Sequence, residues 1–142
     1  MIPTENPGSA ILALHRATHA TLQALTARLA HLDLPAADIN VLANLADGEA
    51  RTVGALADAT ATKPSTLTSL LDRLAKRGYI VREVDPADRR SFMVRLTPAG
   101  RAAARRAAEA VAGLERQALA TVTPAQLAGF HVLIDALTEA SR

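Results

Sequence analysis

The chain has 142 residues, a net charge of +2 and no cysteine. This length suffices for one domain with a modest core, and the lack of cysteine excludes disulfides, thiolate metal sites and cysteine nucleophiles. Hydrophobic residues make up 49% of the chain and aromatic residues only 2%, which favours helices packed through Leu and Ala. We therefore predict a single, mainly α domain over residues 1–142.

Neither the N-terminal residues nor the uncharged stretch near the C-terminus predicts a targeting or membrane segment. Residues 1–8 hold two prolines and a glycine, and they lack the basic start and apolar core of a secretory signal, so we expect a loose tail. The stretch 117–134 is interrupted by Pro124 and His131, which argues against a membrane span. We expect a soluble, cytoplasmic protein.

The charge is segregated along the chain. Between residues 63 and 106, eleven Lys and Arg residues stand against four Asp and Glu residues, a net charge of +7, whereas the rest of the chain carries −5. A basic block inside an acidic chain indicates a polyanionic partner, because each neutralised phosphate releases counterions. An ordinary solvated face is the alternative.

The first two predicted helices precede this block. Ser9 can cap a first helix whose apolar residues recur at spacings of three and four. Because Arg16 and Arg28 are its only formal charges, we expect it to be buried on more than one side, against a partner subunit. Pro35 starts a second helix that ends near residues 47–48.

Two short helices separated by a three-residue turn then predict a helix-turn-helix. Thr52 caps the first of them, over 53–58, and Thr62 caps the next, which has Pro64 in its first turn and ends at Gly78. Four leucines of the latter helix share its buried face. The opposite face and its flanks present Ser65, Ser69, Asp72 and Lys76, with Thr66, Thr68 and Arg73.

After Gly78 the hydrophobic period changes from 3.6 to 2, which predicts two strands. One alternating set consists of Ile80, Arg82 and Val84 in the first strand and Phe92, Val94 and Leu96 in the second. The connecting turn, 85–90, contains Asp and Pro and ends in Arg89 and Arg90. A hairpin with a basic tip directly after a helix-turn-helix predicts a wing.

Two long helices close the chain, beginning at Thr97-Pro98 and Thr123-Pro124 and running to about residues 120 and 140. Together with the first helix they form an apolar set that needs a partner to cover it. We therefore predict an obligate homodimer, with 9–33 and 101–142 as dimerisation helices and 35–100 as a winged helix-turn-helix lobe.

The stretch from Leu56 to Gly100 resembles the MarR family of bacterial regulators, named for multiple antibiotic resistance. The basic-tipped hairpin closed by Leu-Thr-Pro-x-Gly is its most specific part. The matching residues are Leu56-Ala57, Asp72-Arg73-Leu74, Lys76, Gly78, Asp85, Asp88-Arg89-Arg90, Val94, Leu96-Thr97 and Gly100. Pro35 departs from the Thr or Ser cap frequent in the family, and residues 63–66 are this chain's own, so no operator sequence carries over.

The resemblance implies a winged helix-turn-helix flanked by dimerisation helices, and a transcription regulator that binds DNA. It further implies repression relieved by a small, often aromatic or anionic, ligand. The expected operator is pseudo-palindromic, because a two-fold dimer places its recognition helices about 34 Å apart. An architectural DNA-binding protein with little sequence preference and no effector is the alternative.

We assign the DNA contacts to the helix after the turn and to the wing. Short hydroxyl side chains allow close approach to base edges, and arginines at a hairpin tip can enter a minor groove. Asp72 or Asp88 is expected to orient one of these arginines. The predicted DNA-binding residues are Lys63, Ser65, Thr66, Thr68, Ser69, Arg73, Lys76, Arg89 and Arg90. Arg101, Arg105 and Arg106 lie at helical spacing after the wing and either touch flanking phosphates or are solvated.

The effector is expected in a crevice where the first helix, the second helix and the helix after the wing meet. His15, Arg16 and His19 are the candidate polar anchors for a carboxylate or phenol. His15 and His19 are four residues apart and could also share a metal, but no third ligand is identifiable, which favours a hydrogen-bonded pair. We predict no metal and no cofactor.

Catalysis is the competing class of function. The sequence contains no recognisable nucleophile elbow and no Gly-rich phosphate loop, and its carboxylates are scattered singly. We therefore predict that the protein is not an enzyme.

Overall fold

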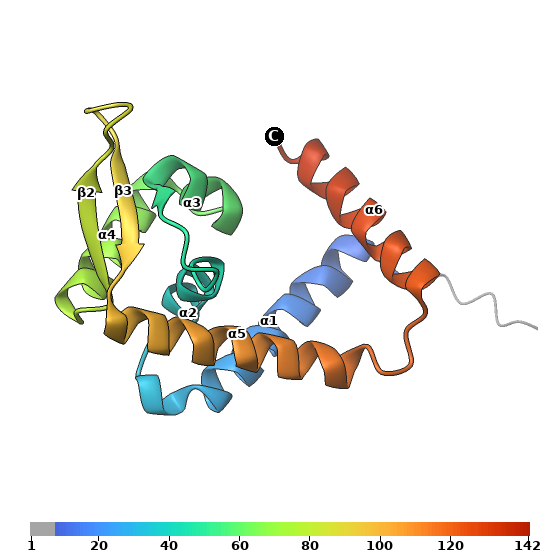
Figure 1. Cartoon of the computed structure of the whole chain (residues 1–142). Helices are drawn as coiled ribbons and strands as arrows, with labels where there is room; N and C mark the ends of the chain where they lie inside the picture. Colours follow the sequence, from blue (N-terminus) through green and yellow to red (C-terminus); the bar gives the residue numbers. More distant parts are fainter. Residues whose placement is uncertain (1–7) are drawn as a thin grey trace, which may run out of the picture.

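The computed structural model describes residues 8–142, so the predicted tail over 1–8 lies outside the described residues except for Gly8. Six α-helices, one short 3₁₀ helix and three strands follow one another in the described part of the chain (Figure 1). In chain order they are α1 (Ala10–Arg28), η1 (Ala30–Leu32), α2 (Ala36–Asn44), β1 (Arg51–Thr52), α3 (Val53–Thr60), α4 (Pro64–Lys76), β2 (Ile80–Val84), β3 (Phe92–Leu96), α5 (Pro98–Ala118) and α6 (Pro124–Ala140).

Local hydrogen bonds set most of the helix starts where the sequence predicts them. The side chains of Ser9, Thr52, Thr97 and Thr123 each accept a hydrogen bond from the backbone N–H three residues ahead, which satisfies a donor that the first turn leaves unpaired. The predicted cap Thr62 is wrong. Lys63 is the N-cap of α4, and the Thr62 hydroxyl instead donates to the carbonyl of Thr60.

The second helix also differs in its bounds. Pro35 is the N-cap of α2 rather than its first residue, and the helix ends at Asn44, before the expected 47–48. Asp47 instead bonds locally, because its carboxylate accepts from the backbone N–H of Glu49 and pairs with Arg51. These bonds shape the connection into β1.

The sheet has three antiparallel strands in the order β1-β3-β2. The hairpin register pairs Ile80 with Leu96 and Val84 with Phe92, so the two alternating sets share one face. Only Ile80, Val94 and Leu96 on this face are buried, whereas Val84 and Phe92 beside the turn are 52% and 48% exposed. Strand β1 pairs with β3 through Arg51 and Thr52. It was not predicted, because two residues show no period.

The core lies between α2, α3, α4, the sheet and the first half of α5. Alanines on α5 let this helix approach α2 closely, and Gly100 lets the start of α5 approach the chain before β2. A Cβ built on Gly100 would lie 1.8 Å from the carbonyl oxygen of Tyr79. The buried residues of these elements include Ile39, Val41, Leu42, Leu56, Leu67, Leu70, Leu71, Leu74, Val94, Leu96, Ala103, Ala104 and Ala107.

The long helices α1 and α6 contribute no buried residue to this core. In Figure 1, α5 runs from the lobe across α1, and α6 turns back beyond it as a separate arm. Neither α1 nor α6 contains a buried residue, so the expected burial of the first helix does not occur within one chain. No helix of the described residues 8–142 is long and apolar enough to cross a membrane.

Candidate nucleic-acid interface

Helix α4 is held by one face and free on the other. Leu67, Leu70, Leu71 and Leu74 are at most 1% exposed, which fixes the rotation of the helix about its axis. Ser65, Thr66, Thr68 and Ser69 are all exposed. The structure therefore brings the four predicted hydroxyl residues together on the solvent side of the first two turns.

Two of these hydroxyls bond back to their own helix. The Thr68 hydroxyl donates to the carbonyl oxygen of Pro64 at 2.9 Å, and the Ser69 hydroxyl donates to that of Ser65 at 3.4 Å. These bonds hold both side chains close to the helix surface. The side chains of the exposed face consequently project little from the helix, which allows the helix to approach base edges closely.

Aspartates build the hairpin tip. The Asp85 carboxylate accepts from the backbone N–H of Ala87 at 2.9 Å, and the Asp88 carboxylate accepts from that of Arg90 at 3.0 Å. The ends of the turn are closed by the backbone N–H of Asp85, which donates to the carbonyl of Ser91. Arg89 and Arg90 are exposed on this tip, so the turn is ordered while its guanidinium groups face solvent.

The predicted aspartate–arginine pairing is wrong in its partners. Asp72 of α4 pairs with Arg82 of β2 at 2.7 Å, and Asp88 bonds to the backbone of Arg90 rather than to a guanidinium. Asp72 lies on the exposed side of α4, where a free carboxylate would repel phosphate. Its pairing with Arg82 neutralises this charge and connects the wing to α4.

Arg73 meets a carboxylate that sequence reasoning missed. Its Nη2 lies 2.6 Å from Oδ1 of Asp38 and its Nε lies 3.3 Å from Oδ2. Asp38 is 0% exposed, and its hydrogen bond and charge raise the pKa of Arg73 above its ordinary value. Helical spacing could have indicated that Asp38 is buried. It lies three and four residues before Val41 and Leu42, and therefore on the same buried stripe of α2.

The other predicted basic residues lie at the edges of the lobe. Lys63 and Lys76 are exposed at the two ends of α4. Arg101 and Arg105 line a cavity of about 450 Å³ beside Asp47, and Arg106 is exposed.

The expected effector crevice is small. The space enclosed by α1, α2 and α5 has a volume of about 50 Å³ and is lined by Leu22, Leu25, Ile39 and neighbouring residues. His15, Arg16 and His19 are exposed on α1 and line none of the cavities described here. Within residues 8–142, no group of three or more His, Asp or Glu side chains is arranged to hold a metal ion.

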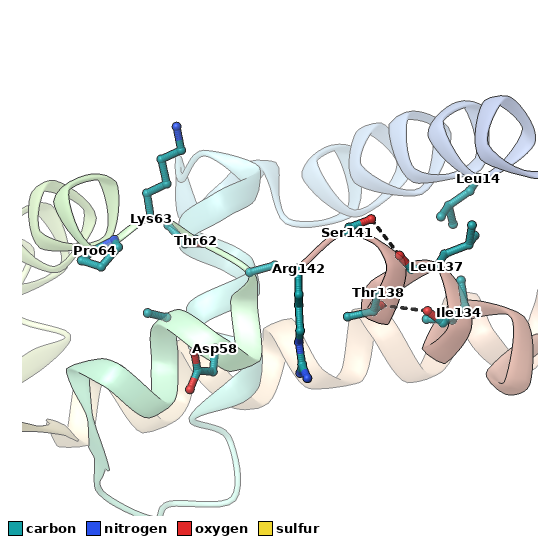
Figure 2. Close-up of a pocket in the computed structure, with 12 residues that line it drawn as sticks. Leu14, Asp58, Thr62, Lys63, Pro64, Ile134, Leu137, Thr138, Ser141 and Arg142 are labelled. Atoms are coloured by element: carbon teal, nitrogen blue, oxygen red, sulfur yellow. Dashed lines mark hydrogen bonds between the residues drawn. The ribbon is translucent and has the colours of Figure 1, made fainter.

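Two larger cavities lie beside the terminal helices. One, of about 810 Å³, separates the end of α6 from the α3–α4 turn. Figure 2 shows Ile134 and Leu137 on one wall, Asp58 on the other and Arg142 between them. The second, of about 510 Å³, is mostly apolar, lies between α1, α5 and α6, and includes Phe130 and His131.

A helix-turn-helix whose exposed helix stands beside a basic hairpin defines the winged helix-turn-helix class of DNA-binding folds. A family model described as MarR family matches residues 32–91, from the end of η1 to the hairpin turn. A relative in Bacillus subtilis, the uncharacterised HTH-type transcriptional regulator YcgE, is 40% identical over 62 residues. That alignment covers 44% of this chain but only 37% of the relative.

Solved structures match nearly the whole chain. BpsR of Bordetella bronchiseptica, whose DNA binding is regulated by 6-hydroxynicotinic acid, is 26% identical with a TM-score of 0.76, over 96% of this chain and 97% of that protein. A mutant MarR from E. coli in complex with operator DNA is 25% identical with a TM-score of 0.72, over 88% and 90%.

The family model thus matches the winged helix-turn-helix lobe, and the chain as a whole has the fold of solved MarR-family structures. This confirms the resemblance and the fold class that the sequence predicts. MarR-family proteins are transcriptional regulators and not enzymes, in agreement with the prediction of no catalysis.

Proposed function

We propose that the protein is a homodimeric repressor that binds a pseudo-palindromic operator through α4 and the β2–β3 hairpin. The observation that carries the proposal is the exposed hydroxyl face of α4, fixed in rotation by four buried leucines and flanked by the basic hairpin tip. The hydroxyl side chains would contact base edges in the major groove. Arg89 and Arg90 would add charge and reach a minor groove.

Dimerisation is supported by the apolar surface of the terminal helices. Leu12 of α1 is 67% exposed and Phe130 of α6 is 52% exposed, although both are large apolar side chains. Ile11, Leu22, Leu119, Val132 and Leu133 are further large apolar residues that are exposed in these helices or at their ends. A second copy of the chain would cover it, and a two-fold axis would set two α4 helices about one turn of DNA, roughly 34 Å, apart.

Selection of duplexes from a random library, followed by footprinting, tests this function. We expect enrichment of an inverted repeat with half-sites about 10 bp apart, and protection of one discrete site. Binding without enrichment of any sequence would support the architectural alternative and reject the operator proposal. Selection with the wild-type protein also provides the duplex on which variants of the protein are compared.

We further propose that a small aromatic acid binds in the cleft shown in Figure 2 and thereby weakens DNA binding. Leu14, Ile134 and Leu137 offer an apolar wall for a ring, and Arg142 carries N–H donors beyond the one that pairs with Glu139. The opposite wall belongs to the turn before α4. A ligand there need favour the DNA-incompetent arrangement by only about 1–3 kcal/mol to weaken binding roughly tenfold to a hundredfold.

Titration of 6-hydroxynicotinic acid and salicylate against the selected complex tests the effector. We expect release by an aromatic acid, and Arg142→Ala should raise the concentration required. His15→Ala and His19→Ala provide the comparison, because these side chains lie outside the cleft. Zinc- or oxidant-dependent release with no response to organic acids would reject the proposal.

A further inference from the structure

Two arginines at the C-terminal end of α4, Arg73 in its last turn and the C-cap Arg77, bond to groups of the protein itself. Arg73 is bidentate to the buried Asp38 of α2. One turn later, Arg77 donates to the carbonyl of Leu32 at 2.6 Å and to that of Asp33 at 3.0 Å. The first attachment therefore joins α4 to α2, and the second joins the C-terminal end of α4 to the segment that connects α1 with α2.

We propose that Arg73 and Arg77 are positioning residues that set the orientation of α4, with Asp38 as the buried anchor, and that neither is a DNA contact. The proposal rests on the proposed DNA-binding function. It revises the assignment of Arg73, which the sequence places in the DNA-binding set because it lies on the flank of the exposed face of this helix. It also removes two positive charges from the number that phosphates can neutralise.

The environment of Asp38 requires a partner. A carboxylate that is 0% exposed loses its hydration, so both of its oxygens need donors. Arg73 supplies two N–H groups in the planar fork that matches a carboxylate. Turning Arg73 toward a phosphate would leave the Asp38 charge buried and unpaired, which opposes such a movement.

The environment of Arg77 is equally specific. Asp33 follows the 3₁₀ helix with a φ of 49°, so the chain turns sharply there and leaves carbonyl groups at a helix end. The Arg77 guanidinium donates to these carbonyl groups. It also lies 5.6 Å from the centre of the Tyr79 ring. Since the linker continues into α1, a displacement of that helix would be passed to α4 through Arg77.

A double-mutant cycle on the selected duplex distinguishes positioning from contact. If Arg73 positions α4, Asp38→Asn and Arg73→Met each weaken specific binding by about tenfold, the double variant is no weaker than the weaker single variant, and the salt slope is unchanged. If Arg73 binds phosphate, Arg73→Met lowers the log–log salt slope by about one, while Asp38→Asn frees the arginine and preserves or strengthens binding. The second pattern would overturn the proposal.

Two further variants keep the test decisive if Asp38→Asn fails to fold. Arg77→Met removes no partner of a buried charge, and the proposal predicts weaker specific binding with unchanged binding to bulk DNA. Arg116→Met, an exposed position near the end of α5, is the matched control. Loss of one unit of salt slope in Arg77→Met, with specificity intact, would reject the positioning role.

Amide hydrogen exchange provides a reading that is independent of DNA. In Arg73→Met and Arg77→Met we expect faster exchange in the second half of α4 and in residues 30–35, and wild-type exchange in Arg116→Met. Unchanged exchange in α4 would overturn the inference even if the protein binds an operator. Conversely, failure of the wild-type chain to select any duplex would reject the proposed function while this reading still tests the positioning role.

Discussion

Gly100 permits the contact between the start of α5 and the chain before β2, and its replacement by Ala tests whether this contact holds the wing in place. An added Cβ would lie 1.8 Å from the Tyr79 oxygen, whereas real Cβ contacts are at least 3.0 Å. The two backbones must therefore separate. The same carbonyl accepts from the backbone N–H of Thr97 at 3.0 Å, and Thr97 caps α5 through the N–H of Gly100.

The expected change in the free energy of unfolding is the sum of two destabilising contributions and one stabilising contribution. Overpacking costs about 1–3 kcal/mol, and a weakened hydrogen bond at Thr97 costs about 1 kcal/mol. Replacing a helical Gly by Ala returns about 1 kcal/mol. We therefore expect Gly100→Ala to lower the free energy of unfolding by about 2 kcal/mol, or the melting temperature by roughly 6 °C at this chain length.

Urea denaturation followed by circular dichroism at fixed protein concentration measures this change. Gly54→Ala is the matched control, because Gly54 is also near a helix start and its Cβ would meet only the Thr52 hydroxyl at 4.0 Å. We expect this control to be neutral or slightly stabilising. A Gly100→Ala protein as stable as the wild type would refute the argument that the contact needs glycine.

Much of the fold could be predicted because local interactions decide it. A helix start such as that at Thr97 depends on one hydrogen bond within four residues, and the hairpin depends on a change of period at Gly78. The error at Thr62 is also local. Pro64 takes the first helical position, which moves the cap to Lys63, a residue whose side chain makes no capping bond.

The site was less predictable wherever partners are distant in sequence. Arg73 and Asp38 are 35 residues apart, and nothing in the local pattern indicates which aspartate will face which arginine. The hydroxyl face of α4 could be predicted, since it is the reverse of a leucine stripe. Cavity size could not, because it depends on how closely α1, α2 and α5 approach one another.

The remaining predictions concern DNA contact and assembly. Arg90→Ala should weaken binding to all duplexes and lower the log–log salt slope by about one, and unchanged affinity and slope would contradict the wing assignment. Ser65→Ala and Ser69→Ala should change the sequences enriched in selection rather than the salt slope. Leu133→Asp should dissociate the dimer. In one chain Leu133 is 45% exposed, so a carboxylate there remains hydrated and the lobe should keep its fold. In the proposed dimer the same carboxylate would be buried on both sides of a two-fold axis, where an unpaired charge is strongly unfavourable. Sedimentation at micromolar concentration measures the result, with Val81→Asp, a 43% exposed position on the hairpin, as control. A dimer that persists in Leu133→Asp, or a wild-type protein that is monomeric, would refute the assignment of the terminal helices to dimerisation.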